Sequence, residues 1–324
     1  MDNPGAPAVR RLRYRRVGAA VGAFVALVAA AIAYDVALKP RLQPQPFVPT
    51  TVGLSPILTA PLDAPVAPDA TLATDASLDP TTQGLWLVDP RGSTVVARRL
   101  ALVGGRLVPM RSVTIELPAE FAGATFAVAG WRSGATNALF ALKLWQRRID
   151  VLAVALTGSQ RVLAAGSAPA PMRAGETRDV SIARLSGPLP DLFVVRRIMR
   201  TGAAIVTVYS GESSFRRAVF SGRLAIRVYR PELWTVAVAD TSPGRPDIAF
   251  LLADVRASGS KKPEIHIVSG ASHYHAITLQ APLELPSTRQ PYRLLLGTSP
   301  GGPSVYAVSP GPKPRLYIVR LGTR

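Results

Sequence analysis

The stretches LSGPLPDLFVV (Leu185–Val195) and TSPGRPDIAFL (Thr241–Leu251) decide the fold, because each leads from a turn rich in Ser, Gly and Pro into an apolar strand. The same unit occurs as RSGATNALFAL (Arg132–Leu142) and TSPGGPSVYAV (Thr298–Val308), and in weaker form as DPTTQGLWLVD (Asp79–Asp89). Equivalent positions of the five copies are 53 to 57 residues apart: Gly84, Asn137, Asp191, Asp247 and Ser304. A repeat of this length has room for four short strands, so the spacing predicts a β-propeller.

We call the repeated unit above the first marker of each repeat. In the three middle copies a second marker follows, an apolar strand that ends in a Gly-containing turn: VLAVALTGSQ (Val151–Gln160), IVTVYSGESS (Ile205–Ser214) and EIHIVSGASH (Glu264–His273). From residue 70 onward, short apolar runs alternate with turns and no stretch keeps a helical period, which indicates an all-β fold. We therefore expect a five-bladed propeller of four-stranded antiparallel blades over residues 70–324. Tandem immunoglobulin-like domains are the alternative, but such domains are nearer ~100 residues long.

The repeat also predicts individual strands, which we name A to D in each blade. In the fourth copy the expected strands are Trp234–Ala239, Asp247–Ala253, Glu264–Ser269 and His273–Gln280. The first strand is expected at Thr71–Thr74, and the chain ends on a third strand at Arg315–Leu321. The last blade then lacks its outer strand, and we expect the segment near Thr50–Thr59 to pair there, since exposed sheet edges invite aggregation.

The paired markers resemble the FG-GAP/VCBS repeats of extracellular propellers, most closely at Pro246–Phe250 with Ile265–Gly270 and at Pro190–Val195 with Val206–Gly211. The resemblance implies a calcium loop of the form D-x-[DN]-x-D-G-x-x-D, since Ca²⁺ prefers carboxylate oxygens. The nearest copy runs from Asp240 to Asp247, is one residue short and lacks the central Asp. Asp240 and Asp247 are thus candidate calcium ligands, with capping of the turn through backbone amides as the alternative.

The N-terminal segment joins a cluster of arginines between Arg10 and Arg16 to an uncharged apolar run, Val17–Tyr34. About 20 apolar helical residues cross a bilayer, and the basic flank stays inside. We expect a cytoplasmic tail over residues 1–16, a transmembrane α-helix over 17–38 and a Pro-rich extended linker over 39–69, with the propeller outside the cytoplasm. Cleavage after Ala33 as a signal peptide is the alternative, and it predicts the same compartment.

Composition limits the chemistry. The 324-residue chain carries 38 Lys and Arg against 20 Asp and Glu and contains no cysteine, so disulfides and thiol chemistry are excluded. A net charge of +18 favours anionic partners. Outside the cytoplasm these are lipid headgroups, an envelope polymer or another envelope protein rather than nucleic acid.

The three histidines of the chain, His266, His273 and His275, lie within ten residues. If Gly270 and Ala271 form a two-residue hairpin turn, His266 opposes His275, and His273 lies on the same sheet face. Three imidazoles on one face could hold Zn²⁺, whereas solvated strand positions are the simpler interpretation. The sequence gives no other metal-ligand cluster and no G-x-S-x-G elbow.

Basic residues recur in the turns between the second and third strands of all five repeats. In an up-and-down blade these turns share one face of the propeller, so we expect a ring of cations that binds an anionic ligand. Its members are Arg91, Arg147, Arg148, Arg196, Arg197, Arg200, Arg256, Lys261, Lys262, Lys313 and Arg315. The four tryptophans, Trp86, Trp131, Trp145 and Trp234, are expected in the core, with a carbohydrate-stacking platform as the alternative.

These observations predict a membrane-anchored, non-catalytic binding or scaffolding propeller at the cell envelope, with no required cofactor. A hydrolase or metal-dependent enzyme seated in the propeller funnel is the alternative.

Overall fold

The computed structural model describes the strands and most of the turns of the propeller region. The described residues are 52–54, 58–61, 71–74, 85–103, 106–132, 136–157, 160–185, 187–228, 234–239, 245–252, 264–283, 285–286, 292–299, 302–309 and 315–323. The expected cytoplasmic tail, transmembrane helix and most of the linker lie outside these residues. None of the helical segments within them is long and apolar enough to cross a membrane.

Antiparallel sheets of consecutive strands make up the described fold, with only two 3-10 turns, Ala119–Phe121 and Gly211–Ser213, as helix. The first blade contains β3 (Thr71–Thr74), β4 (Leu85–Arg91), β5 (Thr94–Val103) and β6 (Arg106–Glu116). The second contains β7 (Thr125–Trp131), β8 (Thr136–Leu144), β9 (Ile149–Ala155) and β10 (Val162–Ala168). The third contains β11 (Glu176–Ala183), β12 (Asp191–Ile198), β13 (Ala203–Tyr209) and β14 (Ala218–Arg227). The fourth contains β15 (Trp234–Ala239), β16 (Asp247–Leu252), β17 (Glu264–Val268) and β18 (Ile277–Pro282).

The remaining sheet differs from these four. It contains β19 (Arg293–Ser299), β20 (Gly302–Val308) and β21 (Arg315–Thr323), with β1 (Val52–Leu54) and β2 (Leu58–Pro61) both paired to β21. The expected number of four-stranded blades is therefore corrected from five to four. The physical reason is that β21 pairs with two short strands from the N-terminal part of the chain rather than with a fourth consecutive strand. Their pairing confirms the expectation for the segment near Thr50–Thr59.

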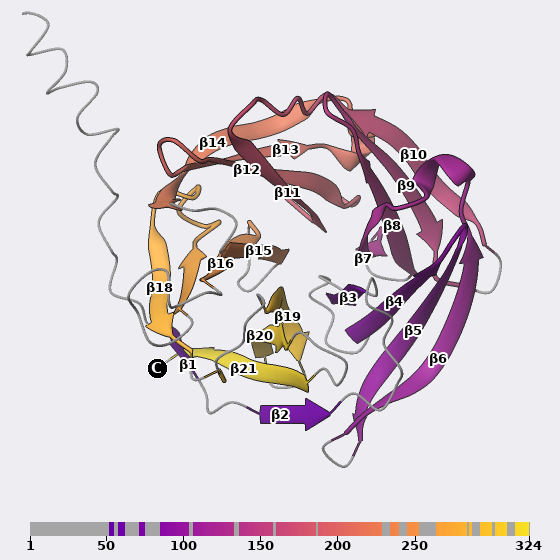
Figure 1. The fold of residues 1–324 in the computed structure, drawn as a ribbon, viewed down its shortest axis with the longest axis horizontal. Helices are drawn as coiled ribbons and strands as arrows, with labels where there is room; N and C mark the ends of the chain where they lie inside the picture. Colours follow the sequence, from indigo (N-terminus) through magenta and orange to yellow (C-terminus); the bar gives the residue numbers. More distant parts are fainter. Residues whose placement is uncertain are drawn as a thin grey trace, which may run out of the picture. The chain divides into compact units, whose positions relative to one another are not determined.

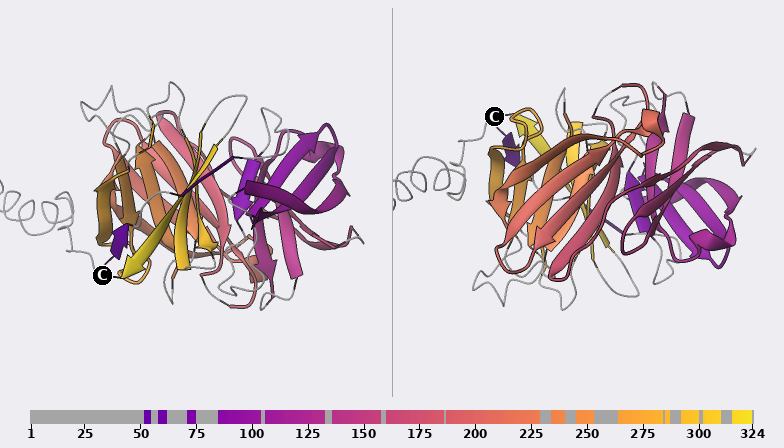
Figure 2. Two further views of the ribbon diagram at one scale, coloured as in Figure 1. Left: turned by 90° about the horizontal axis from the view of Figure 1, so that it is seen from below. Right: turned by 90° about the horizontal axis from the view of Figure 1, so that it is seen from above.

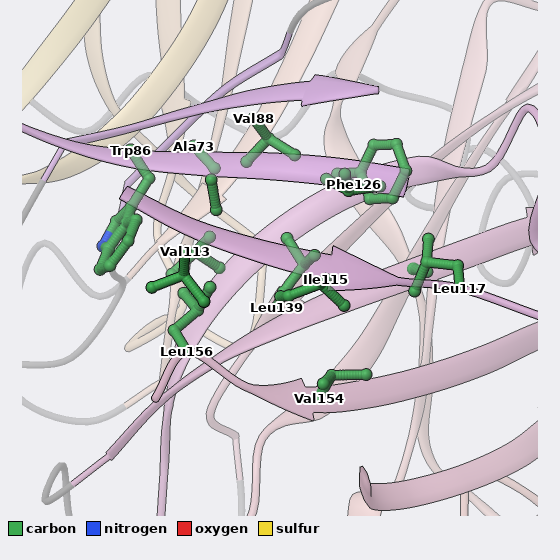
Figure 3. Packing of buried hydrophobic residues seen from close by; sticks show 14 of the residues in the cluster. Ala73, Trp86, Val88, Val113, Ile115, Leu117, Phe126, Leu139, Val154 and Leu156 are labelled. Carbon is green, nitrogen blue, oxygen red and sulfur yellow. The ribbon is translucent and has the colours of Figure 1, made fainter. Parts of the chain in front are cut away.

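Apolar clusters join neighbouring sheets face to face. One cluster joins the first two blades and includes Trp86, Phe126, Leu139 and Leu156, as Figure 3 shows. Another brings β4 together with β20 and β21 through Leu87, Tyr306 and Leu316. The first strand of each sheet, β3, β7, β11, β15 or β19, lies toward the centre in Figure 1. Each buried Leu, Ile, Val or Phe stabilises such a core by about 1.5–3 kcal/mol.

The strands of each blade run between two faces of the propeller (Figure 2). We call one the B–C face, because it carries the turns between second and third strands together with the connections between sheets. Backbone hydrogen bonds from Leu117 to Ser93 and from Met199 to Gly175 join these turns and connections. The opposite end carries the turns between third and fourth strands, and we call it the C–D face.

Candidate functional site

The described part of the predicted cationic ring is largely paired. Arg91 and Arg148 lie 2.9 and 3.0 Å from the carboxylates of Asp89 and Asp150. Arg196 and Arg197 belong to strand β12 rather than to its turn. Their carboxylate partners are Glu176 at 3.7 Å and Asp179 at 2.7 Å.

Because of these ion pairs, several arginines of the predicted ring make structural contacts and are not available to a ligand. Arg197 is buried, and its Nη1 also donates to the carbonyl oxygen of Trp234, so it joins two blades rather than facing a ligand. Burial raises the pKa of Asp179, and Arg197 opposes that rise. Arg147, Arg200 and Arg315 are exposed. Arg256, Lys261, Lys262 and Lys313 lie outside the described residues.

Exposed arginines are not confined to the B–C face. Arg161, Arg216 and Arg217 are exposed on the C–D face. Positive charge alone therefore does not distinguish the two ends of the propeller. The exposed apolar side chains that lie among these arginines do distinguish the two ends.

Trp145 distinguishes the B–C face. It lies directly after β8 and is 42% exposed, which corrects the expectation of a core position. Its Nε1 donates to Oδ2 of Asp150 at 2.6 Å. The Lys143 ammonium and the Arg148 guanidinium lie 5.6 and 5.7 Å from the ring centroid, within the range of cation–π attraction. The indole is thus held in one orientation while almost half of its surface faces solvent.

Two exposed methionines accompany it. Met172 is 39% exposed, and its amide donates to the carbonyl oxygen of Gln146, next to Trp145. Met199 is 51% exposed, and its amide donates to the carbonyl oxygen of Gly175. The two turns and the connection between the second and third blades therefore form one braced surface.

Arg178 supports this surface from below. It projects from β11 and donates from Nη2 to the carbonyl oxygen of Trp145 at 2.8 Å and from Nη1 to that of Ala170 at 2.5 Å. Tyr209 donates to the carbonyl oxygen of Pro169 at 2.7 Å. Burial lowers the pKa of Arg178, and Tyr209 opposes this shift. Burial raises the pKa of Tyr209, and Arg196 and Arg178 oppose that shift. The hydrogen bonds of Arg178 and Tyr209 hold the turn at Trp145 and the connection at Pro169 and Ala170 in place.

The histidines are not arranged as the sequence suggested. His266 pairs with Gln280 in the sheet, so the expected register opposite His275 is wrong. The reason is a wide turn in which His273 and Tyr274 both take left-handed φ, which delays β18 to Ile277. His266 is buried with Nε2 3.1 Å from Oε1 of Glu264, whereas His273 and His275 are exposed outside the strands.

Asp247 is a hydrogen-bond acceptor for a backbone amide. It is buried, and its Oδ1 accepts a hydrogen bond from the Gly270 amide at 2.7 Å. Asp191 takes the same role in the third blade, accepting from Gly211 at 3.0 Å and from Leu185 at 2.9 Å. These contacts agree with the amide-capping alternative. Asp240 lies outside the described residues, and within them no three His, Asp or Glu side chains are grouped as metal ligands.

Comparison with known proteins gives structural similarity only. No family model matches the chain, and no curated protein matches it. AofleA from Arthrobotrys oligospora is 11% identical, with 87% of this chain and 95% of that chain covered at a TM-score of 0.45; a mutant of it with three arginines changed to alanine gives 0.47. A GH43 β-1,3-galactosidase with galactodeoxynojirimycin is 7% identical, with 77% of this chain and 89% of that chain covered at a TM-score of 0.43.

Proposed function

We propose that this protein is a non-catalytic binding module at the cell envelope. It binds an anionic ligand, lipid headgroups or an envelope polymer, through its B–C face. In this proposal an N-terminal anchor over residues 17–38 carries the propeller outside the cytoplasm, and the FG-GAP-like repeats close as a ring through the β1–β2–β21 edge. The observation that carries the proposal is the exposed, immobilised Trp145 on the B–C face. A side chain held so firmly loses little entropy on binding.

The arrangement of carboxylates favours binding over hydrolysis. A glycosidase of the usual kind needs two accessible carboxyl groups across a substrate. Asp191 and Asp247 are buried and accept backbone amides. Asp150 is bonded to Trp145, and Glu264 accepts from Gln280. These four groups are therefore committed to structural contacts.

The test uses the full chain held by its anchor in neutral phosphatidylcholine nanodiscs. Binding to phosphatidylglycerol vesicles and to soluble polyphosphate is measured over a salt titration. The double variant Arg147→Ser/Arg200→Ser should bind about 30-fold more weakly, since each cation near an anionic surface contributes about 1 kcal/mol.

The matched control is Arg161→Ser/Arg217→Ser, which removes the same charge from the C–D face. It should change affinity by less than about threefold, the effect of net charge alone. Equal losses in both double variants, or no binding by the wild-type chain to either probe, would contradict the proposal.

A further inference from the structure

Exposed apolar side chains gather on the B–C face of the second and third blades. Six large apolar residues are strongly exposed among those described, and three of them, Trp145, Met172 and Met199, lie on this braced surface. The others, Met110, Val162 and Val219, lie singly on the outer strands β6, β10 and β14. Single exposed apolar residues need no explanation, but a group of three on one rigid surface indicates a contact site.

Cations border this group. Arg147 lies two residues after Trp145, Arg173 follows Met172 and Arg200 follows Met199, and all three arginines are exposed. We call these six residues the Trp145 patch. The neighbouring acids are neutralised, since Asp150 is paired with Arg148 and Glu176 lies 3.7 Å from Arg196. The patch therefore combines apolar tips with uncompensated positive charge.

From this arrangement we infer that the Trp145 patch inserts into the headgroup region of an anionic lipid bilayer. The inference rests on the proposed function and names its partner. Tryptophan favours the membrane–water interface, where its apolar ring and polar edge meet different surroundings. Arginines beside it would contact lipid phosphates, as in peripheral proteins that combine buried apolar area with electrostatic attraction.

The surroundings of Trp145 favour lipid over a protein partner. Tryptophans that dominate protein interfaces lie in desolvated pockets near the centre of the contact. Here the exposed arginines Arg147, Arg173 and Arg200 border the apolar side chains, and removing water from these cations without phosphates to replace it would be costly. A headgroup layer supplies anionic oxygens at the same depth as the indole.

Insertion is tested by quenching. The full chain in neutral nanodiscs is mixed with phosphatidylglycerol vesicles whose acyl chains are brominated near the headgroup, and tryptophan fluorescence is recorded. Bromine should quench a component of the wild-type emission that is missing in Trp145→Phe, because Trp86 is 2% exposed and Trp131 and Trp234 are partly buried. Trp145→Ala should weaken vesicle binding about tenfold.

Methionine variants provide the matched pair. Met199→Ser should weaken vesicle binding about threefold, whereas Met110→Ser, which changes an even more exposed methionine on β6, should leave it unchanged. An unchanged melting temperature of each variant shows that the loss is not one of folding.

Two results would overturn the inference while the proposed function survives: salt-sensitive vesicle binding without quenching of Trp145, or binding to polyphosphate alone. Failure to bind either anionic probe would overturn both. Equal quenching in the wild-type chain and in Trp145→Phe would also reject insertion of the patch.

Discussion

The C–D face and the B–C face are ends of the same strands, yet they are built in opposite ways. On the C–D face, Ser210–Phe215 and Ser269–Tyr274 share most of their hydrogen bonds. Ser213 and Ser272 each donate to the carbonyl oxygen three residues back, and Phe215 and Tyr274 each donate their amides to the first serine. On the B–C face, Trp145 has no counterpart in the third repeat, where Met199 begins the equivalent turn.

This difference separates structure from candidate function. Residues that recur at the repeat spacing are buried and satisfy backbone groups, as Asp191 and Asp247 do. Residues that break the repeat and remain exposed, although held in place, are free to serve a ligand. In a repeat protein the informative side chains are therefore those that the repeat does not require.

The largest expected effect comes from removing a repeated carboxylate. Asp191→Ala leaves the amides of Gly211 and Leu185 without their acceptor, and we expect a loss of about 4 kcal/mol in the free energy of unfolding. Asp150→Ala, on the B–C face, should lose less than about 1 kcal/mol, because its two partners, Arg148 and Trp145, are exposed and can be hydrated instead. Denaturant titration of the full chain in detergent measures the free energy of unfolding of both variants. Similar losses would contradict the difference between the two faces.

The second-largest expected loss of stability comes from replacing a glycine where a C–D turn packs closely against neighbouring backbone. A Cβ at Gly211 would lie 2.1 Å from the carbonyl oxygen of Pro190, so Gly211→Ala must displace backbone and should cost about 3 kcal/mol. Gly92, in a B–C turn, has a φ of +67° and open space around it. Gly92→Ala should cost only about 1 kcal/mol, the strain of left-handed backbone. Thermal unfolding measures both, and the reverse order would refute the close-packing argument.

Much of the fold could be predicted from the repeat. The expected strands Thr71–Thr74 and Trp234–Ala239 coincide with β3 and β15, because their turns and apolar runs are local features. The strand expected at His273 begins at Ile277 instead, since two successive left-handed residues widen the turn in a way that Ser-Gly in the sequence does not reveal. That shift alone separates His266 from His275.

The candidate site could be predicted only in part. The sequence identified the B–C face through Arg147, Arg148 and Arg200, but placed Trp145 in the core. Its exposure depends on contacts between distant segments, such as the bond from Arg178 to its carbonyl oxygen across 33 residues. A pattern within one repeat contains no trace of such a contact. The buried position of Arg197 also involves a neighbouring blade, since its Nη1 donates to the carbonyl oxygen of Trp234.

The smallest expected effect is on the pH dependence of stability, and it concerns equivalent positions in two blades. Thr207 and His266 occupy the same place in the second markers, and both are buried. Thr207 hydrogen-bonds Ser221, whereas burial lowers the pKa of His266 against the opposing effect of Glu264. One buried site is therefore neutral at every pH, and the other resists protonation.

Because the folded protein disfavours a proton that the unfolded chain accepts near pH 6.5, stability should be fully present above that pH and decrease on acidification below it. We expect this decrease to be absent from a variant without the imidazole. His266→Thr, which introduces the residue of the third blade, should flatten the profile measured by denaturant titration at each pH. The raised pKa of Asp179 acts in the opposite direction but is common to both proteins, so it cancels in their difference. An identical slope in wild type and variant would mean that His266 binds its proton equally well in the folded and unfolded chains.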